Sequence, residues 1–174
     1  MYVFVLDQAR NVQLVQSSGE SIHQLTNWDA LLGGVFDVTI AAQNMLSAAE
    51  HSGLGGVYLG SILNDPQRMI DLLHLPRYTF PLLGMKIGVP AEDPEVKPRL
   101  PHKLVVGTDT YPPVDKTALA DYDATVRNYY ASRSWNQRDV SYTESMVAHL
   151  TASLHHRDEI GRILAAQGFE LPQD

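Results

Sequence analysis

Two short basic segments contain the side chains best suited to bind an anion. The first, "EVKPRLP", places Lys97 and Arg99 on either side of Pro98. Residues two apart in an extended segment project to the same side, so both cations could face one phosphate. Arginine supplies a fixed fork of donors and lysine a mobile point charge. The alternative is a solvated loop in which both cations pair with the acidic residues between 92 and 95.

The second basic segment, "SRSWNQRD", places Arg133 and Arg138 on either side of Trp135. A loop of this composition could hold a phosphorylated ligand, with the indole of Trp135 lying against a ring of that ligand. The alternative is an exposed hinge in which the tryptophan serves as an anchor. The local pattern leaves both interpretations open.

A glycine-rich run, "HSGLGGVYLGSILND", extends from His51 to Asp65. It is not a P-loop, because no Lys followed by Ser or Thr comes after its second glycine. A dinucleotide-binding fingerprint opens a helix directly after a strand, whereas this run follows a predicted helix and includes a predicted strand. Glycines beside a strand indicate that something approaches the backbone closely, either a ligand or a packed helix.

The histidines and the cysteine content give no metal or thiol chemistry. His155 and His156 are adjacent on a predicted helix and cannot both face one metal ion, and His149 precedes them by about two helical turns. We therefore assign no metal site. The chain has no cysteine, which excludes disulfides, thiolate catalysis and iron–sulfur clusters.

Hydrophobic spacing predicts the elements that must position these segments. We expect strands at 2–6, 12–16, 56–60 and 81–90, and helices at 38–51, 65–75, 115–131 and 143–167. Asp37 and Asp65 are the expected N-caps of the first two helices, and Gly168 is expected to end the last. This mixed order of strands and helices is typical of an α+β or α/β protein.

The overall composition is that of a soluble globular protein. The 174 residues are 44% hydrophobic and 19% charged, and this length is most simply one domain. A formal net charge of −7 argues against a general nucleic-acid binder. No apolar run approaches the ~20 residues of a membrane span, and the N-terminus does not have the pattern of a signal peptide. We therefore expect a cytoplasmic protein with no membrane or nucleic-acid partner.

Three longer segments resemble consecutive parts of the FMN-dependent nitroreductase family. They are "DVTIAAQNMLSAAEHSGLGGVYLGSILND", "LLHLPRYTFPLLGMKIGVPAEDPEVKPRLP" and "YDATVRNYYASRSWNQRDVSYTE". The resemblance covers nearly the whole chain, in order and with similar spacing. It points to the branch that contains the NADPH-dependent oxygen-insensitive nitroreductases and the NADPH–FMN oxidoreductases.

The resemblance implies an α+β fold with a central, mostly antiparallel sheet packed by helices, and an intertwined homodimer with FMN at the interface. It implies a single domain over 1–174, in which 140–174 is a helical arm that reaches the partner. Family members carry a segment with an "HRSxRxF"-like motif before the first strand, and that motif contacts FMN. The start at "MYVFVLD" therefore resembles a family sequence truncated at its N-terminus.

The resemblance also implies where the site lies. The stretch that runs along the flavin ring matches Tyr58, Leu59, Gly60 and Ser61. The pair that binds the FMN phosphate matches Lys97 and Arg99. The basic residues that hold the 2′-phosphate of NADPH match Arg133 and Arg138.

The implied reaction is a ping-pong oxidoreduction. NADPH gives a hydride to FMN and leaves, and a nitro compound, a quinone or free flavin then takes the electrons. No side chain is expected to act as an obligatory acid or base. The alternative is a flavin-poor remnant of the family that folds and dimerises as a binding or structural protein without redox activity.

Overall fold

The computed structural model describes residues 1–152 and 157–171. The chain divides into two compact units: unit 1 comprises Met1–Ala91 with Leu154–Asp174, and unit 2 comprises Glu92–Ser153. Each unit has its own packing and is described by itself. The expected single domain over 1–174 stays a prediction, and the boundary between the two units falls within the predicted arm at 140–174.

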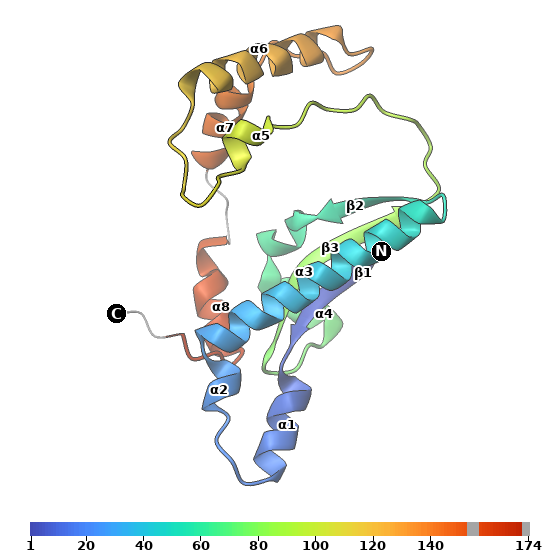
Figure 1. The fold of residues 1–174 in the computed structure, drawn as a ribbon. Helices are drawn as coiled ribbons and strands as arrows, with labels where there is room; N and C mark the ends of the chain where they lie inside the picture. Colours follow the sequence, from blue (N-terminus) through green and yellow to red (C-terminus); the bar gives the residue numbers. More distant parts are fainter. Residues whose placement is uncertain (153–156, 172–174) are drawn as a thin grey trace. The chain divides into compact units, whose positions relative to one another are not determined.

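Unit 1 is built on an antiparallel sheet whose described strands lie in the order β1-β3-β2. The strands are β1 (Tyr2–Asp7), β2 (Gly55–Leu59) and β3 (Thr79–Gly88). The other elements of unit 1 are α1 (Ala9–Ser17), α2 (His23–Thr26), α3 (Trp28–His51), the 3-10 helix η1 (Gly60–Asn64), α4 (Pro66–Leu73), the 3-10 helix η2 (Arg157–Glu159) and α8 (Ile160–Ala166). The long helix α3 lies along the sheet (Figure 1). An antiparallel sheet packed by helices confirms the predicted fold class.

The central strand β3 pairs with a neighbour on each side. Met85 lies opposite Tyr2 of β1 and Tyr58 of β2, and its side chain is fully buried. A strand flanked on both sides has no free edge, which fits its long apolar sequence. The strands predicted at 81–90 and 56–60 are confirmed, with ends shifted by one or two residues.

The segment 12–16, which we predicted to be a strand, is helical. In α1, Val12 is buried and Val15 is half-buried, three positions apart on one helical face, while Leu14 is exposed. The run "VQLVQ" fits either periodicity because it is so short. The carboxylate of Asp7 accepts a hydrogen bond from the N–H of Ala9 at 2.8 Å, which starts the helix directly after β1.

Helix α3 begins at Trp28 rather than at Val38, so the prediction that Asp37 caps it is wrong. Its N-cap is Asn27, whose side-chain oxygen accepts a hydrogen bond from the N–H of Ala30 at 3.0 Å. Asp37 lies exposed in the interior of the helix.

A glycine in the interior of α3 explains how close this helix comes to the sheet. A Cβ added at Gly34 would lie 2.7 Å from Cγ of Leu6 on β1, nearer than any side chain could stand. Glycine in a helix costs about 1 kcal/mol relative to alanine. The close packing of α3 on β1 at Gly34 offsets this cost. The periodicity of the sequence alone does not reveal this packing.

The core of unit 1 joins the two ends of the chain. Its buried cluster consists of Leu6, Leu31, Ile70, Phe80, Ile163, Leu164 and Phe169. The amide of Gln167 donates to the carbonyls of Pro76 and Thr79 at 3.1 and 3.0 Å, which attaches the end of α8 to the start of β3. Gly168 ends α8 with a φ of 99°, as predicted, where a Cβ would lie 2.6 Å from the ring of Tyr78.

Unit 2 contains α5 (His102–Val105), α6 (Lys116–Ser132) and α7 (Tyr142–Leu150). Asp115 caps α6 by accepting a hydrogen bond from the N–H of Ala118, and this bond lowers the pKa of Asp115. A capping box of Ser141 and Glu144 begins α7, and the N–H of Ser141, followed by the guanidinium of Arg127, lowers the pKa of Glu144. The helix predicted from 115 is confirmed.

The helical region predicted over 143–167 is divided in the structure. Its described parts are α7, η2 and α8, and they belong to different units. His149 lies on α7, whereas His155 and His156 lie outside the described residues.

Candidate functional site

The end of β2 presents open backbone. Tyr58 and Leu59 are the last residues of this strand, and Gly60 and Ser61 begin η1. Gly60 and Ser61 are exposed, and a Cβ added at Gly60 would meet no atom within 4 Å. At Gly56, by contrast, a Cβ would lie 2.4 Å from a methyl of Leu46. The two interpretations of the glycine-rich run therefore apply to different glycines: Gly56 allows a helix to pack, and Gly60 leaves room for a ligand.

A groove of about 470 Å³ lies beside this strand end. It is lined by Thr39, Ile40, Gln43, Tyr58 and Leu83. The hydroxyl of Tyr58 donates to the side-chain oxygen of Gln43 at 2.9 Å and fixes the tyrosine on the edge of the groove. An apolar lining with a few polar groups is typical of a site for a flat organic ligand.

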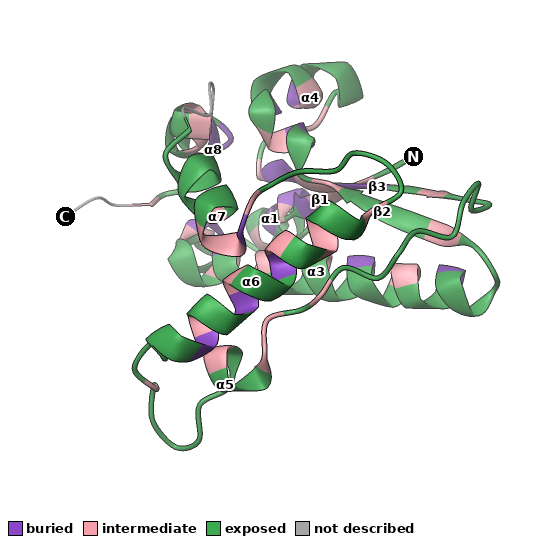
Figure 2. Ribbon diagram, turned by 90° about the horizontal axis from the view of Figure 1, so that it is seen from above, coloured by how far each residue is buried: buried purple, intermediate pink, exposed green. Residues whose placement is uncertain are grey.

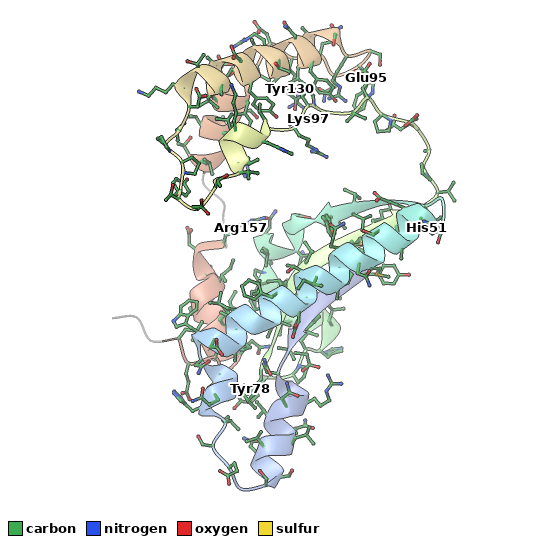
Figure 3. The ribbon with its side chains drawn as sticks, viewed as in Figure 1. His51, Tyr78, Glu95, Lys97, Tyr130 and Arg157 are labelled. Atoms are coloured by element: carbon green, nitrogen blue, oxygen red, sulfur yellow. The ribbon has the colours of Figure 1, made fainter. Side chains whose placement is uncertain are left out.

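Arg157 fastens the turn that follows β2, and sequence reasoning did not single it out. Its guanidinium donates to the carbonyl of Gly60 at 2.9 Å and to the side-chain oxygen of Asn64 at 3.0 and 3.1 Å (Figure 3). It thereby holds both ends of η1. Arg157 and Asn64 are 93 positions apart, so no local spacing could have indicated the pair.

In unit 2, α6 holds the "KPR" segment by its tyrosines. The hydroxyl of Tyr122 donates to the carbonyl of Pro98 at 2.9 Å, and that of Tyr129 donates to the carbonyl of Glu95 at 3.2 Å. The ammonium of Lys97 lies 5.4 Å from the ring centroid of Tyr130 (Figure 3). The loop is therefore anchored to a helix at three successive points.

The two cations of this loop have no acidic partner within the described part of the chain. Lys97 and Arg99 are exposed, and neither forms an ion pair with a described carboxylate. The alternative of salt bridges to the acids between 92 and 95 is thus not what the structure shows. Both charges remain available to an anion from outside the loop.

The second basic segment folds into a turn after α6. Asn136 adopts a left-handed φ of 54°, and the N–H of Arg138 returns to the carbonyl of Tyr130 at 3.4 Å. Arg133 lies 4.7 Å from the ring centroid of Trp135. Trp135 is 56% exposed, which argues against the interpretation of this tryptophan as an anchor.

The structure brings together some of the predicted site residues. Lys97, Arg133 and Arg138 gather around Tyr130 in unit 2, whereas Arg99 forms no hydrogen bond, ion pair or ring contact among the described residues. The stretch from Tyr58 to Ser61 belongs to unit 1. The roles assigned to these residues stay predictions.

Comparison with known proteins decides the family. The family model described as the nitroreductase family, C-terminal domain, matches residues 97–172. The chain is 41% identical over 143 residues to the oxygen-insensitive NADPH nitroreductase of Salmonella typhimurium, covering 82% of this chain and 58% of that protein. The solved NfrA1 nitroreductase from B. subtilis matches with a TM-score of 0.88 at 31% identity, covering 96% of this chain and 68% of that one. The chain belongs to the nitroreductase family.

A further solved relative of this nitroreductase-family chain lies in the predicted branch. The NADPH:FMN oxidoreductase from Vibrio harveyi, solved in complex with NAD⁺, matches with a TM-score of 0.79 at 32% identity, covering 99% of this chain and 67% of that one. The predicted resemblance is thus confirmed. The chain spans 58%, 63% and 60% of the length of three curated relatives that it matches.

Each unit, taken by itself, offers groups that fit a part of FMN, the cofactor that this family implies. Open backbone at Gly60 would admit a ring against the strand end, and the groove beside Tyr58 suits an apolar aromatic group. Lys97 and Arg99, without a described acidic partner, suit a phosphate.

Proposed function

We propose that the protein is an FMN-dependent NAD(P)H oxidoreductase that reduces nitro compounds, quinones or flavins by a ping-pong reaction. The observation that carries this proposal is the anchored loop in which Lys97 and Arg99 have no described acidic partner. It is supported by the names of two relatives, the NADPH nitroreductase of Salmonella typhimurium and the NADPH:FMN oxidoreductase of Vibrio harveyi.

The protein's own contribution is binding and orientation. When bound, the flavin supplies the hydride chemistry. Residues 58–61 would support its ring, with Gly60 permitting close approach of the backbone. Lys97 and Arg99 would hold the FMN phosphate, while Arg133 and Arg138 would hold the 2′-phosphate of NADPH. No side chain is required as an acid or base.

A visible absorbance spectrum of the purified protein tests this function. We expect flavin bands near one FMN per chain, and bleaching of those bands when NADPH is added without oxygen. A colourless protein that does not take up added FMN would contradict the proposal. It would favour the alternative of a flavin-poor family member with a binding or structural role.

Helix α3 presents an exposed apolar row that we assign to a homodimer interface. Trp28, Leu32, Phe36 and Ile40 recur at every fourth position and are 49%, 49%, 61% and 68% exposed. Most of α3 is coloured as exposed in Figure 2, and the residues that it buries are Leu31, Ala42 and Ala49, none of which belongs to this row. By length and composition alone, α3 is also long and apolar enough to cross a membrane. A single helix of this kind is weak evidence for a membrane span, because the core helix of a soluble protein passes the same test. We propose that a second copy of the chain covers this row and that residues 140–174 reach that partner. We also propose that the protein is cytoplasmic.

Placing a charge in this row should dissociate the dimer. We expect Phe36→Glu to raise the dimer dissociation constant by about a hundredfold or more, because an unpaired charge would be buried at the interface. Sedimentation equilibrium measures this dissociation constant. The matched control is Leu14→Glu, at a leucine that is 65% exposed on α1. Equal dissociation constants for the two variants would argue against this interface.

A further inference from the structure

One aromatic ring in unit 2 is surrounded by cations. The ammonium of Lys97 lies 5.4 Å from the ring centroid of Tyr130, and the guanidinium carbons of Arg133 and Arg138 lie 5.9 and 5.8 Å from it. All three are within the distance at which the electron-rich face of a ring attracts a cation. Lys97 precedes α6 by nearly twenty residues, so the fold, and not the local sequence, brings it to this ring (Figure 3).

The position of the Tyr130 ring is itself constrained. Tyr129 packs edge-on against it, with ring centroids 5.3 Å apart. The carbonyl of Tyr130 accepts the N–H of Arg138, so the turn that carries both arginines is attached to the same residue. Tyr130 thus contacts the arginine loop through its backbone and its side chain, and Arg133 also lies 5.7 Å from the ring centroid of Tyr129 and 4.7 Å from that of Trp135.

The charge balance around the ring favours an external anion. Lys97, Arg133 and Arg138 repel one another, and no carboxylate within the described residues forms an ion pair with any of them. The ring offsets only part of this repulsion. A phosphate monoester, with its near-double negative charge and its acceptor oxygens, would offset much more. The fold itself therefore places these three cations together at one ring.

We propose that Tyr130 is a positioning residue that sets the preference for a nucleotide with an additional phosphate. It holds Arg133 and Arg138 at its ring, so that a phosphate on the ribose meets two guanidiniums at once, while Lys97 at the same ring keeps its role at the FMN phosphate. This inference rests on the proposed function, because it assumes that the arginine loop receives NADPH. It assigns no bond-making step to the tyrosine.

Calorimetric titration with two probes tests this role. The probes are adenosine 2′,5′-bisphosphate, which carries the additional phosphate, and adenosine 5′-monophosphate, which lacks it. We expect Tyr130→Leu to weaken binding of the bisphosphate about tenfold, equivalent to about 1.4 kcal/mol, and to leave binding of the monophosphate unchanged. Tyr130→Phe should retain the affinity for the bisphosphate, because it keeps the ring face. The control is Tyr111→Leu, at a tyrosine of unit 2 that is 94% exposed.

The outcomes separate this inference from the function on which it rests. If the wild-type protein binds both probes equally, the assigned nucleotide site is wrong and the inference falls with it. If the wild type prefers the bisphosphate and Tyr130→Leu keeps that preference, the proposed function stands and the role of Tyr130 is overturned. A Tyr130→Phe variant as weak as Tyr130→Leu would also overturn it, since the hydroxyl rather than the ring face would then matter.

Discussion

Replacing Lys97 and Arg99 together by alanine is expected to weaken FMN binding by about two to four orders of magnitude. Each cation would contribute a charge-assisted hydrogen bond to the phosphate, and such bonds are worth about 1.5–3 kcal/mol each. Neither side chain has a described acidic partner, so their removal should disturb no internal ion pair. Quenching of flavin fluorescence on titration of the flavin-free protein measures the affinity.

A second double variant controls for net charge. Lys116→Ala with Arg10→Ala removes the same two kinds of cation from exposed positions on α6 and α1. We expect its FMN affinity to stay close to that of the wild type. Unchanged FMN affinity in the Lys97 and Arg99 variant would refute their phosphate role, and an equal loss in the control would mean that overall charge is responsible.

Leu6→Ala is expected to destabilise unit 1 by about 2–5 kcal/mol, a large share of the total stability of about 5–15 kcal/mol typical of a domain. Leu6 is 1% exposed and belongs to the cluster that unites β1, α3, β3 and α8. It also fills the space opposite Gly34, so its truncation leaves a cavity where helix and sheet come closest. Urea unfolding followed by circular dichroism measures the free energy of unfolding.

Leu14→Ala is the matched control for this experiment. Leu14 is 65% exposed on α1, and the same substitution there should change the free energy of unfolding by about 0.5 kcal/mol or less. Equal losses at the two leucines would show that the packing between β1 and α3 is not what stabilises unit 1.

Local sequence signals, which act within one or two helical turns, correctly predicted where some helices begin and end. Asp65 with Pro66 starts α4, and Gly168 ends α8, because a cap acts on backbone groups only a few residues away. The prediction that Asp37 caps α3 was wrong because a local signal does not show whether another cap lies earlier in the chain. Asp37 has the chemistry of a cap, but Asn27 supplies an earlier one, and packing on β1 carries the helix through the intervening glycines.

The candidate site likewise has parts that the sequence predicted and parts that it could not predict. The two basic segments and the glycine-rich run could be recognised from residue types and from the resemblance to a family. Which glycine packs and which stays open could not, because that depends on whether Leu46 of α3 or empty space lies opposite. The role of Arg157 in holding η1 could not be seen either, because its partner lies 93 positions away.

By itself, the sequence determined the family, the mixed class of fold and the ends of several helices, such as both ends of α4 and of α6. These depend on composition, on periodicity and on contacts between near neighbours. Only the tertiary structure decided that Lys97, Arg133 and Arg138 share the ring of Tyr130, and that the two cations of the "KPR" loop lack a described acidic partner. The physical reason is that electrostatic and aromatic contacts act through space at a few ångströms, and the fold alone sets which distant residues come that close.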